Sequence, residues 1–310
     1  MMEQVVFLCG ALRSGSSLTH LMLDHHPNIK NPGEFDFLFD QVSNEGVFPE
    51  ITSYHEWLST HRIFQSKSLL VDTSLNYLEL IASFIEQLSV NGSVLALNVH
   101  RSFHRIPFLF SDAKYIHLVR DPRDVARSSI GMGWAGNVYY GVDHWVATEN
   151  SWVLLESKIQ PEQVLQVRFE YLISSPEQSL NRVCEFVGLV YSARMMDYTL
   201  QSSYSKPDTS LVNQWKRKLS VREIEYVELK ASTLLGGLGY ELSGKGIKPL
   251  TIIERSILGI GNKIFRYHFS LKRYGFFLVV KVKLSRLFGI RSIYNKGRLQ
   301  MNELENKLIK

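Results

Sequence analysis

The sequence predicts an α/β fold, a parallel β-sheet with flanking helices. Strand-like apolar runs alternate with helical patterns along the chain, as in strands joined by crossover helices. The first run, residues 4–9, is apolar almost throughout, which is typical of a strand covered on both faces. The chain has 310 residues, of which 45% are hydrophobic and 21% charged, enough to bury a large core.

The expected elements follow in order along the chain. After the first strand comes a helix with Leu18, Leu21 and Met22 on one face, which stops before Pro27. Further strands are expected at residues 69–72, 94–97, 115–119 and 164–168.

Two later helices carry clear start signals. Residues 176–187 form a helix that Ser175 caps, with Pro176 at its first position and Gly188 at its end. The pair Ser220 and Glu223 has the spacing of a capping box that opens another helix.

Charge divides the chain into two parts. Residues 245–310 hold 15 of the 35 Lys and Arg but only three of the 30 Asp and Glu, so the net charge of this segment is +12. The net charge of the whole chain is +5. The break coincides with a glycine-rich stretch, residues 236–246. We therefore expect a catalytic domain over 1–244 and a basic, helical C-terminal extension over 245–310. The extension is either a solvated appendage or a contact for an anionic surface.

Several classes of protein are disfavoured. No apolar run approaches the ~20 residues of a membrane span, and the N-terminus lacks a signal-peptide pattern. Cys9 and Cys184 make neither a disulfide framework nor a zinc site, so we expect a cytoplasmic protein. Residues 276–280 are expected to be buried against the body or another subunit. The cations of 271–290 do not gather on one helical face, so peripheral membrane contact through the extension is left open.

The loop after the first strand is a candidate phosphate site. Residues 10–17 read Gly-Ala-Leu-Arg-Ser-Gly-Ser-Ser, and a glycine loop before a helix can offer backbone N–H groups to an anion. The glycine spacing matches a P-loop, but Ser16 stands in place of the lysine of NTPases. Arg13 is the nearest cation, which disfavours ATP hydrolysis.

A second candidate anion site follows the strand 115–119. Arg120 stands at its carboxyl end, Asp121 caps a helix that begins at Pro122, and Ser128 lies about two turns along. Because ligands of parallel sheets bind at the carboxyl ends of strands, this site and the 10–17 loop should share one crevice. Alternatively, Arg120 is a salt-bridge partner of a neighbouring aspartate, Asp121 or Asp124.

Together these motifs resemble sulfotransferases that use 3′-phosphoadenosine 5′-phosphosulfate (PAPS). The segment "LCGALRSGSSLTHLMLDHHPNI" with the following Pro-Gly-Glu, and "LVRDPRDVARSSI", are similar to the two donor-binding motifs, most closely in the tyrosylprotein and bacterial branch. The resemblance covers about residues 4–240 and implies a P-loop-like sulfotransferase fold. It implies that the 5′-phosphosulfate is bound by Arg13, Ser14, Gly15, Ser16, Ser17 and Leu18. It implies that Arg120 and Ser128 bind the 3′-phosphate.

Two weaker similarities extend the expected donor site. "VLQVRFEYLISSPEQ" places Phe169 where the family has an aromatic residue against adenine, with core packing as the alternative. "NQWKRKLSVREIE" resembles a late segment near the donor phosphates. This segment suggests roles for Lys206, Trp215 and Lys216, with a solvated basic turn as the alternative.

The resemblance also implies a catalytic base. Glu34 matches the glutamate base of the tyrosylprotein branch, and Asp36, His100 and His104 are alternatives. A family lysine expected after the third strand is missing near Asn98. Its role then falls to Arg13, His100 or Arg101. We expect no metal, since no cluster of metal ligands stands out.

The predicted function is in-line transfer of a sulfuryl group from PAPS to an acceptor hydroxyl or amine, leaving 3′,5′-phosphoadenosine. The acceptor is expected to be a carbohydrate or glycolipid. The two segments that should shape its pocket, 31–68 and 132–152, are rich in aromatic residues, which suit sugar faces and phenols alike. No nucleic-acid partner is expected. The alternatives are a P-loop kinase or NTPase, and a non-catalytic protein that binds acidic polymers or membranes through the extension.

Overall fold

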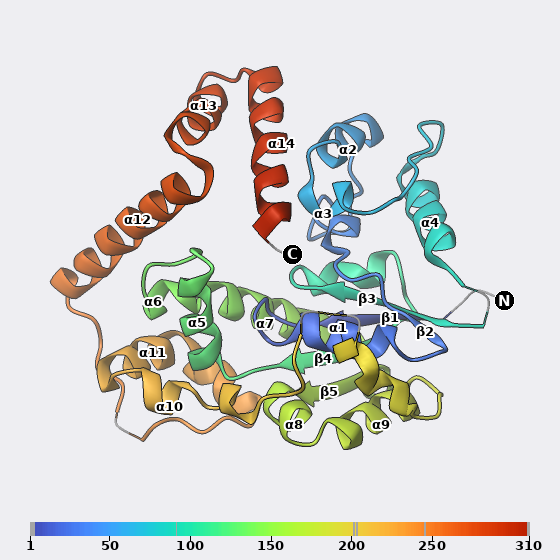
Figure 1. The fold of residues 1–310 in the computed structure, drawn as a ribbon, viewed down its shortest axis with the longest axis horizontal. Coiled ribbons are helices and arrows are strands. Elements are labelled where there is room, and N and C mark those ends of the chain that lie inside the picture. The colour runs from blue at the N-terminus through green and yellow to red at the C-terminus, as the bar shows by residue number, and fades with distance from the viewer. Residues whose placement is uncertain (1–3, 91, 201, 203, 245, 309–310) are drawn as a thin grey trace.

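A five-stranded parallel sheet lies at the centre of the protein (Figure 1). The structure is a computed structural model, which describes residues 4–308 except 91, 201, 203 and 245. The strands, in the spatial order β2-β3-β1-β4-β5, are β1 (Val5–Cys9), β2 (Ile29–Lys30), β3 (Val94–Val99), β4 (Lys114–Val119) and β5 (Val164–Arg168). Every pairing is parallel, so all carboxyl ends meet at one edge.

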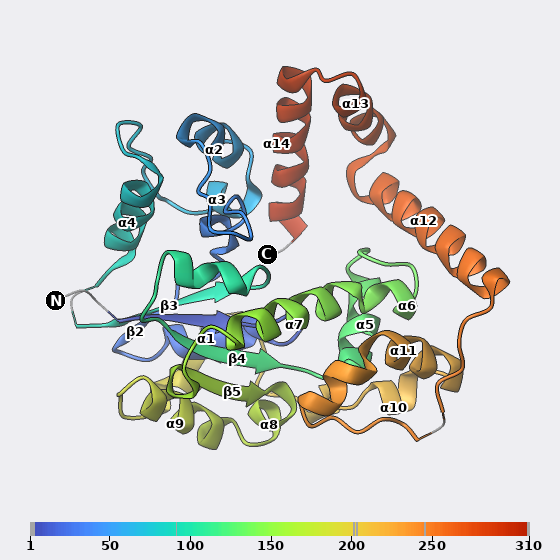
Figure 2. The same cartoon turned by 180° about the vertical axis from the view of Figure 1, so that it is seen from behind.

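Helices cover both faces of the sheet (Figures 1 and 2). On one face Phe7, Leu97 and Tyr115 pack with side chains of four helices, namely α2 (Ile51–Leu58), α3 (Arg62–Gln65), α4 (Tyr77–Leu88) and α7 (Asp143–Glu156). On the other, Leu8 and Ile116 pack with α1 (Ser16–Asp24), α8 (Phe169–Ser174), α9 (Pro176–Phe186) and the 3₁₀ segment η4 (Ala193–Leu200). This two-sided burial is why the strands are apolar at consecutive positions.

A third cluster of apolar side chains lies beyond the carboxyl edge of the sheet. It joins α7 to α5 (Pro122–Gly131), α6 (Val138–Gly141) and α11 (Val221–Gly237). The remaining helices are α10 (Trp215–Lys218), α12 (Ile252–Tyr274), α13 (Phe276–Leu287) and α14 (Arg291–Leu308). The shorter 3₁₀ segments are η1 (Asp36–Leu38), η2 (Phe103–Phe108), η3 (Pro161–Gln163) and η5 (Thr209–Leu211).

The expected α/β fold with a parallel sheet is confirmed, with one strand wrong and one missed. Residues 69–72 form no strand: the backbone of Leu70 instead exchanges hydrogen bonds with the side chain of Gln87, at 2.8 and 3.0 Å. The second strand is the two-residue β2, which is too short to leave a periodic signal.

The helix start signals predicted from the sequence are confirmed, with one exception. Asp121 caps α5 by accepting a hydrogen bond from the N–H of Arg123, and Ser220 and Glu223 form the capping box of α11. Helix α9 begins at Pro176 as expected, but the side chain of Ser175 forms no capping hydrogen bond.

Helices α12–α14, here called the C-terminal arm, extend from the body and return to it (Figures 1 and 2). Within α12, Asn262 accepts a hydrogen bond from the N–H of Gly136 at 2.7 Å. Near the end of α14, Asn302 donates to the carbonyl of Thr60 at 3.1 Å, and Glu305 pairs with Arg62 at 3.0 Å. The arm is therefore fixed to the body through both α12 and α14.

Within this chain, the expected burial of residues 276–280 is observed only in part, and burial against another subunit stays a prediction. Phe276 is 58% exposed and Phe277 is 88% exposed, while Val279 is buried. A helix can bury only one face against its neighbours, and in α13 that face carries Val279 and Val282. Among the described residues, no helix has the length and apolar character needed to cross a bilayer.

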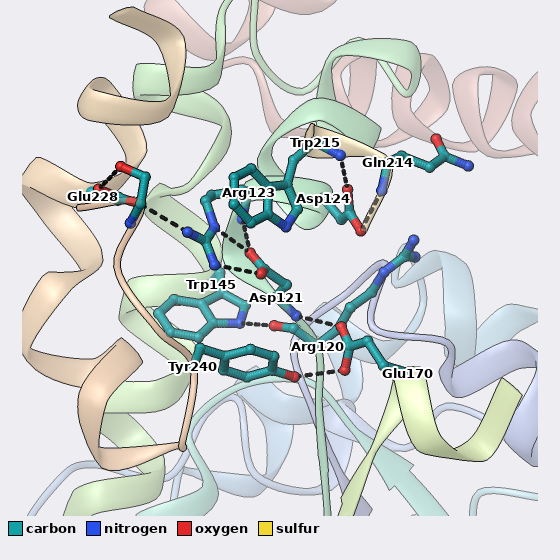
Figure 3. A network of polar contacts seen from close by, with 11 residues as sticks. Arg120, Asp121, Arg123, Asp124, Trp145, Glu170, Gln214, Trp215, Glu228 and Tyr240 are labelled. Atoms are coloured by element: carbon teal, nitrogen blue, oxygen red, sulfur yellow. Dashed lines mark hydrogen bonds and ion pairs between the residues drawn. The ribbon is translucent and has the colours of Figure 1, made fainter. Parts of the chain in front are cut away.

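A buried polar network ties α5 to the C-terminal half of the body (Figure 3). Arg123 donates two hydrogen bonds to Asp121, at 2.9 and 2.7 Å, and one to Glu228 at 2.8 Å. Its guanidinium also lies 3.6 Å from the ring centroid of Trp215. Arg123, Asp121 and Glu228 are each at most 2% exposed, so one buried cation compensates two buried carboxylates.

Replacing Arg123 should therefore destabilise the fold. In Arg123→Met, two carboxylates stay buried without their cation, and we expect a loss of about 3–5 kcal/mol in the free energy of unfolding, measured by urea denaturation. The double variant R123M/E228Q should recover part of this loss. A loss below about 1 kcal/mol in R123M would show that water or other groups satisfy the two carboxylates.

Candidate active site

The predicted site residues gather at the carboxyl edge of the sheet. The loop 10–15 follows β1, His100 follows β3, Arg120 follows β4 and Phe169 follows β5. Parallel pairing brings these four positions to the same edge although they lie far apart in the sequence.

The loop after β1 has the backbone geometry of an anion site. Gly15 has φ of 95° and precedes α1, and Arg13 has φ of 74°. Within the described chain, the N–H groups of residues 16–18 have no hydrogen-bond partner, as usual in the first turn of a helix. The Oγ of Ser14 is also buried without a partner. Unpaired donors and the helix dipole make this loop suited to an anionic oxygen group.

The two motifs are in direct contact. The Nε of Arg13 donates to the Oγ of Ser128 at 2.9 Å, and Arg120 donates to the carbonyl of Arg13 at 3.0 Å. A second N–H of Arg120 donates to the carbonyl of Leu211, also at 3.0 Å. The two motifs, 107 or more positions apart in the sequence, thus meet in space.

The alternative role for Arg120, an ion pair with Asp121 or Asp124, is not observed. Asp121 pairs with Arg123 instead, and no carboxylate of the described residues lies within ion-pair distance of Arg120. Burial lowers the pKa of the Arg120 guanidinium from its ordinary value, and its Nε is buried without a partner. Its charge is therefore available to an anionic ligand.

Phe169 lies beneath these cations rather than on an open surface. Its ring centroid is 4.1 Å from the guanidinium carbon of Arg120, and the ring is 3% exposed. A Cβ at position 15 would come within 2.3 Å of the same ring, so only glycine fits there. The ring supports Arg120 and the loop, which agrees with the packing alternative.

The late segment contributes unequally to the site. Trp215 is buried on Arg123, and its backbone N–H donates to Asp124 at 2.7 Å, which brings it beside α5 (Figure 3). Burial raises the pKa of Asp124 to about 6. Lys206 and Lys216 are exposed, so the fold buries Trp215 beside α5 but leaves the two lysines in solvent.

Glu34 is held at the end of β3 by backbone pairing. The N–H of Phe35 donates to the carbonyl of Asn98 at 2.8 Å, and the N–H of Asn98 donates to Gly33 at 2.9 Å. The side chain of Asn98 accepts a hydrogen bond from Asn31 at 3.1 Å. The Glu34 carboxylate is 36% exposed. Asn98, at the site of the missing lysine, anchors the loop that carries the candidate base.

His100 faces Glu34 in a fixed orientation. Its Nδ1 bonds the carbonyl oxygen of Gly10 at 2.8 Å, so Nδ1 carries a proton. Its Nε2 lies 3.7 Å from the Glu34 carboxylate and is buried without a hydrogen-bond partner. In the neutral ring this Nε2 presents a lone pair toward a carboxylate. A single proton shared between the Nε2 of His100 and the Glu34 carboxylate would give both a hydrogen-bond partner.

The other candidate bases, and Arg101 as a candidate replacement for the missing lysine, already form hydrogen bonds within the protein. Asp36 accepts the N–H groups of His100 and Arg101 at 2.7 and 3.1 Å, and burial raises its pKa. Both ring nitrogens of His104 are hydrogen-bonded, to Ser151 and Asn44. Arg101 binds Asp40 through two N–H groups. These side chains hold the loops in place and leave Glu34 and His100 as the available pair.

Lys67 is a site residue that the sequence analysis missed. Its Nζ donates to the carbonyl of Pro32 and lies 4.9 Å from the ring centroid of Phe35. Burial lowers its pKa, which the nearby Glu34 carboxylate counteracts. No motif surrounds Lys67, and only its place in the aromatic-rich segment 31–68 hints at a role.

The comparisons with known proteins agree with this geometry. A model described as "Sulfotransferase family" matches residues 5–193. The chain belongs to the sulfotransferase family. This decides against the alternative of a P-loop kinase or NTPase.

Relatives of this sulfotransferase differ in their acceptors. The chain is 25% identical to a candidate protein-tyrosine sulfotransferase of Caenorhabditis briggsae. The match covers 63% of this chain and 69% of that protein. It is 29% identical to mouse carbohydrate sulfotransferase 2, but over only 42% of this chain and 35% of the mouse protein.

Solved sulfotransferase structures share the fold. The sulfotransferase domain of the Synechococcus PCC 7002 olefin synthase aligns with a TM-score of 0.61 at 19% identity, over 77% of this chain and 96% of that one. The domain from the curacin biosynthetic pathway aligns with a TM-score of 0.56 at 20% identity, over 78% and 99% of the two chains. In the part of this sulfotransferase that the structure describes, no three His, Cys, Asp or Glu side chains are grouped to hold a metal ion.

Proposed function

We propose that this sulfotransferase transfers a sulfuryl group from PAPS to an acceptor hydroxyl or amine. The observation that carries the proposal is the contact between the two anion motifs, Arg13 with Ser128 and Arg120 with the Arg13 carbonyl. A donor with phosphate groups at both its 5′ and 3′ positions needs two anion sites in one crevice.

The side chains at the crevice fit such a donor. The unpaired N–H groups of residues 16–18 and the hydroxyls of Ser14, Ser16 and Ser17 would bind the 5′-phosphosulfate together with Arg13. Arg120 and Ser128 would bind the 3′-phosphate. The buried, unpaired Nε of Arg120 supports this assignment, because an unsatisfied guanidinium N–H is costly unless a ligand accepts its hydrogen bond.

The proposed chemistry assigns separate tasks to the two sides of the crevice. Glu34 takes the proton of the acceptor hydroxyl, and His100 lies where it can share that proton. PAPS supplies the sulfuryl group and the phosphate that leaves. Negative charge develops on the leaving oxygen, and we assign its stabilisation to Arg13 in the donor loop and to Lys67, whose charge interacts with Glu34. Lys67 thereby takes the place of the missing family lysine.

A sugar hydroxyl, free or on a glycolipid, is the proposed acceptor. The support is the similarity to a carbohydrate sulfotransferase, together with Trp134 and Tyr140, which line a hollow that reaches Leu12, since aromatic rings pack well on sugar faces. Tyrosine and other phenols are the competing acceptors, as the similarity to a candidate protein-tyrosine sulfotransferase indicates.

Donor binding provides the first test. We expect 3′,5′-phosphoadenosine to bind without magnesium in isothermal titration. Arg120→Ala and the double variant S16A/S17A should weaken binding by roughly 10- to 100-fold, because each removes hydrogen bonds to a charged phosphate. The exposed Arg182 of α9 gives the control R182A, which should bind as the wild type does. Equal thermal stabilisation by ATP with magnesium and by the bisphosphate would argue against the proposal.

Transfer of labelled sulfate to a panel of sugars, glycolipids, tyrosine peptides and phenols tests the base. Glu34→Gln should lower kcat by roughly 10²- to 10⁴-fold while 3′,5′-phosphoadenosine still binds. Lys67→Met should lower kcat as well, because it removes a cation beside the reacting groups. The exposed loop carboxylate Glu45 gives the control E45Q. Wild-type kcat in E34Q would place the base elsewhere.

The location of the enzyme is part of the proposal. On α12, Ile253, Ile257, Ile260 and Ile264 recur at helical spacing and are 60–72% exposed. Exposed apolar stripes mark interaction surfaces, and the net charge of +12 over 245–310 disfavours self-association and favours an anionic surface. We propose peripheral contact of the arm with an anionic membrane. The expected cytoplasmic location stays a prediction.

Vesicle sedimentation tests this contact. The protein should bind phosphatidylserine-containing vesicles, and binding should weaken as salt rises. The triple variant I257S/I260S/I264S should bind roughly 10-fold or more weakly, because it removes apolar area from the contact. The exposed pair on α7 gives the control V153S/L154S. Failure of the wild type to sediment with anionic vesicles would refute the membrane contact.

A further inference from the structure

The C-terminal arm encloses a cavity with the body. Its volume is about 580 Å³. On the body side it is lined by Met132, Gly133 and Trp134, which follow α5. The arm supplies the rest of the lining: Lys263, Arg266, Tyr267, Phe269, Ser270, Arg273, Tyr274, Lys283 and Glu305. The arm contributes most of this surface, so the cavity depends on it.

The cavity is strongly cationic. Four of its lining side chains are Lys or Arg, and Glu305 is the one carboxylate among them. That carboxylate is already bound by Arg62, at 3.0 Å, and by the hydroxyl of Tyr274. Among the described residues, none of the four cations pairs with an acid. Their charge is free to bind an anion from solution.

Aromatic rings hold two of these cations in place. The Nζ of Lys283 lies 4.1 Å from the ring centroid of Tyr267, and the guanidinium of Arg273 lies 4.6 Å from that of Phe269. The ring of Phe269 in turn rests on Gly133, where a Cβ would approach it to 2.2 Å. Cations stacked on rings keep their N–H groups directed outward, toward a ligand.

The cavity continues to the donor loop. Trp134 and Arg266 line it and also line a neighbouring hollow of about 300 Å³. That hollow reaches Leu12, the residue before Arg13, and His144, whose Nε2 bonds the carbonyl of Leu12 at 3.1 Å. A molecule seated in the cationic cavity can therefore extend along Trp134 to the loop that carries the candidate donor site.

We propose that the cavity is an acceptor subsite for an acidic saccharide, one that carries a carboxylate, sulfate or phosphate group beside the sugar to be sulfated. The inference rests on the proposed function and narrows its acceptor class. Lys263, Arg266, Arg273 and Lys283 bind the anionic group, and the rings of Trp134 and Tyr267 contact the sugar faces. The arm thus selects the acceptor.

Binding of matched oligosaccharides tests this proposal. Isothermal titration would compare a hyaluronan tetrasaccharide and a chondroitin sulfate tetrasaccharide with the carboxyl-reduced, neutral form of the first. We expect at least one acidic member to bind roughly 10-fold or more tightly than the neutral one, with an affinity that falls as salt rises. The same titration with an acidic glycolipid headgroup in neutral vesicles separates a lipid-borne source from a free saccharide.

A charge-matched pair of variants locates the binding. K263Q/R266Q/R273Q should lower the affinity for the acidic member by roughly 10-fold or more. R255Q/K272Q/K281Q removes the same charge from exposed positions of α12 and α13 that do not line the cavity, and it should bind as the wild type does. Thermal melting of both variants confirms that they fold.

Titration of 3′,5′-phosphoadenosine into the same variants separates the two proposals. Both triple variants should keep wild-type affinity for the bisphosphate, so failure of donor binding in the wild type would refute the function and not the subsite. Equal affinity for neutral and acidic tetrasaccharides, equal losses in the two triple variants, or no binding of any acidic member would each overturn the subsite.

Discussion

The hydrogen bond from Arg120 to the carbonyl oxygen of Arg13 joins the two halves of the site. It connects the end of β4 to the loop after β1, while Arg13 reaches across to Ser128 on α5. Two arginines would ordinarily repel each other at this distance, yet here the backbone carbonyl of one accepts from the other. Both guanidinium groups are thereby held beside the loop after β1, and no carboxylate of the described residues forms an ion pair with Arg120.

The side chains around Arg120 hold it in place. Directly beneath Arg120 lies the ring of Phe169, and the backbone carbonyl of Arg120 is held by the indole N–H of Trp145 at 3.1 Å (Figure 3). The adjacent Asp121 is committed to Arg123, and its N–H is bound by Glu170 at 3.0 Å. The neighbouring acids are therefore hydrogen-bonded within the scaffold, and Asp124 and Glu170 act on Arg120 without forming an ion pair with it.

Buried polar side chains also fix the backbone around Glu34 and His100. Asp36 is buried, and it fixes the backbone of His100 and Arg101. Asn98 fixes the Glu34 loop, and Arg101 neutralises Asp40. Among the described residues, the Nε2 of His100 is left without a hydrogen-bond partner, 3.7 Å from the Glu34 carboxylate. Lys67 enters beside this pair from a loop that no strand or helix pattern specifies.

The sequence by itself determined the parallel sheet, the two anion motifs and their order, because these depend on local signals: apolar strands, glycine turns and helix caps. The sequence did not predict β2, because a strand of two residues shows no alternating pattern. It wrongly predicted a strand at 69–72, because tertiary packing decides the conformation of a short apolar run. Only the tertiary structure decided that Phe169 packs under Arg120, that Lys67 binds the carbonyl of Pro32 near Glu34, and that the basic arm lines a cationic cavity beside Trp134. Each of these depends on side chains brought together from distant parts of the chain, and spacing along a sequence carries no record of such distances.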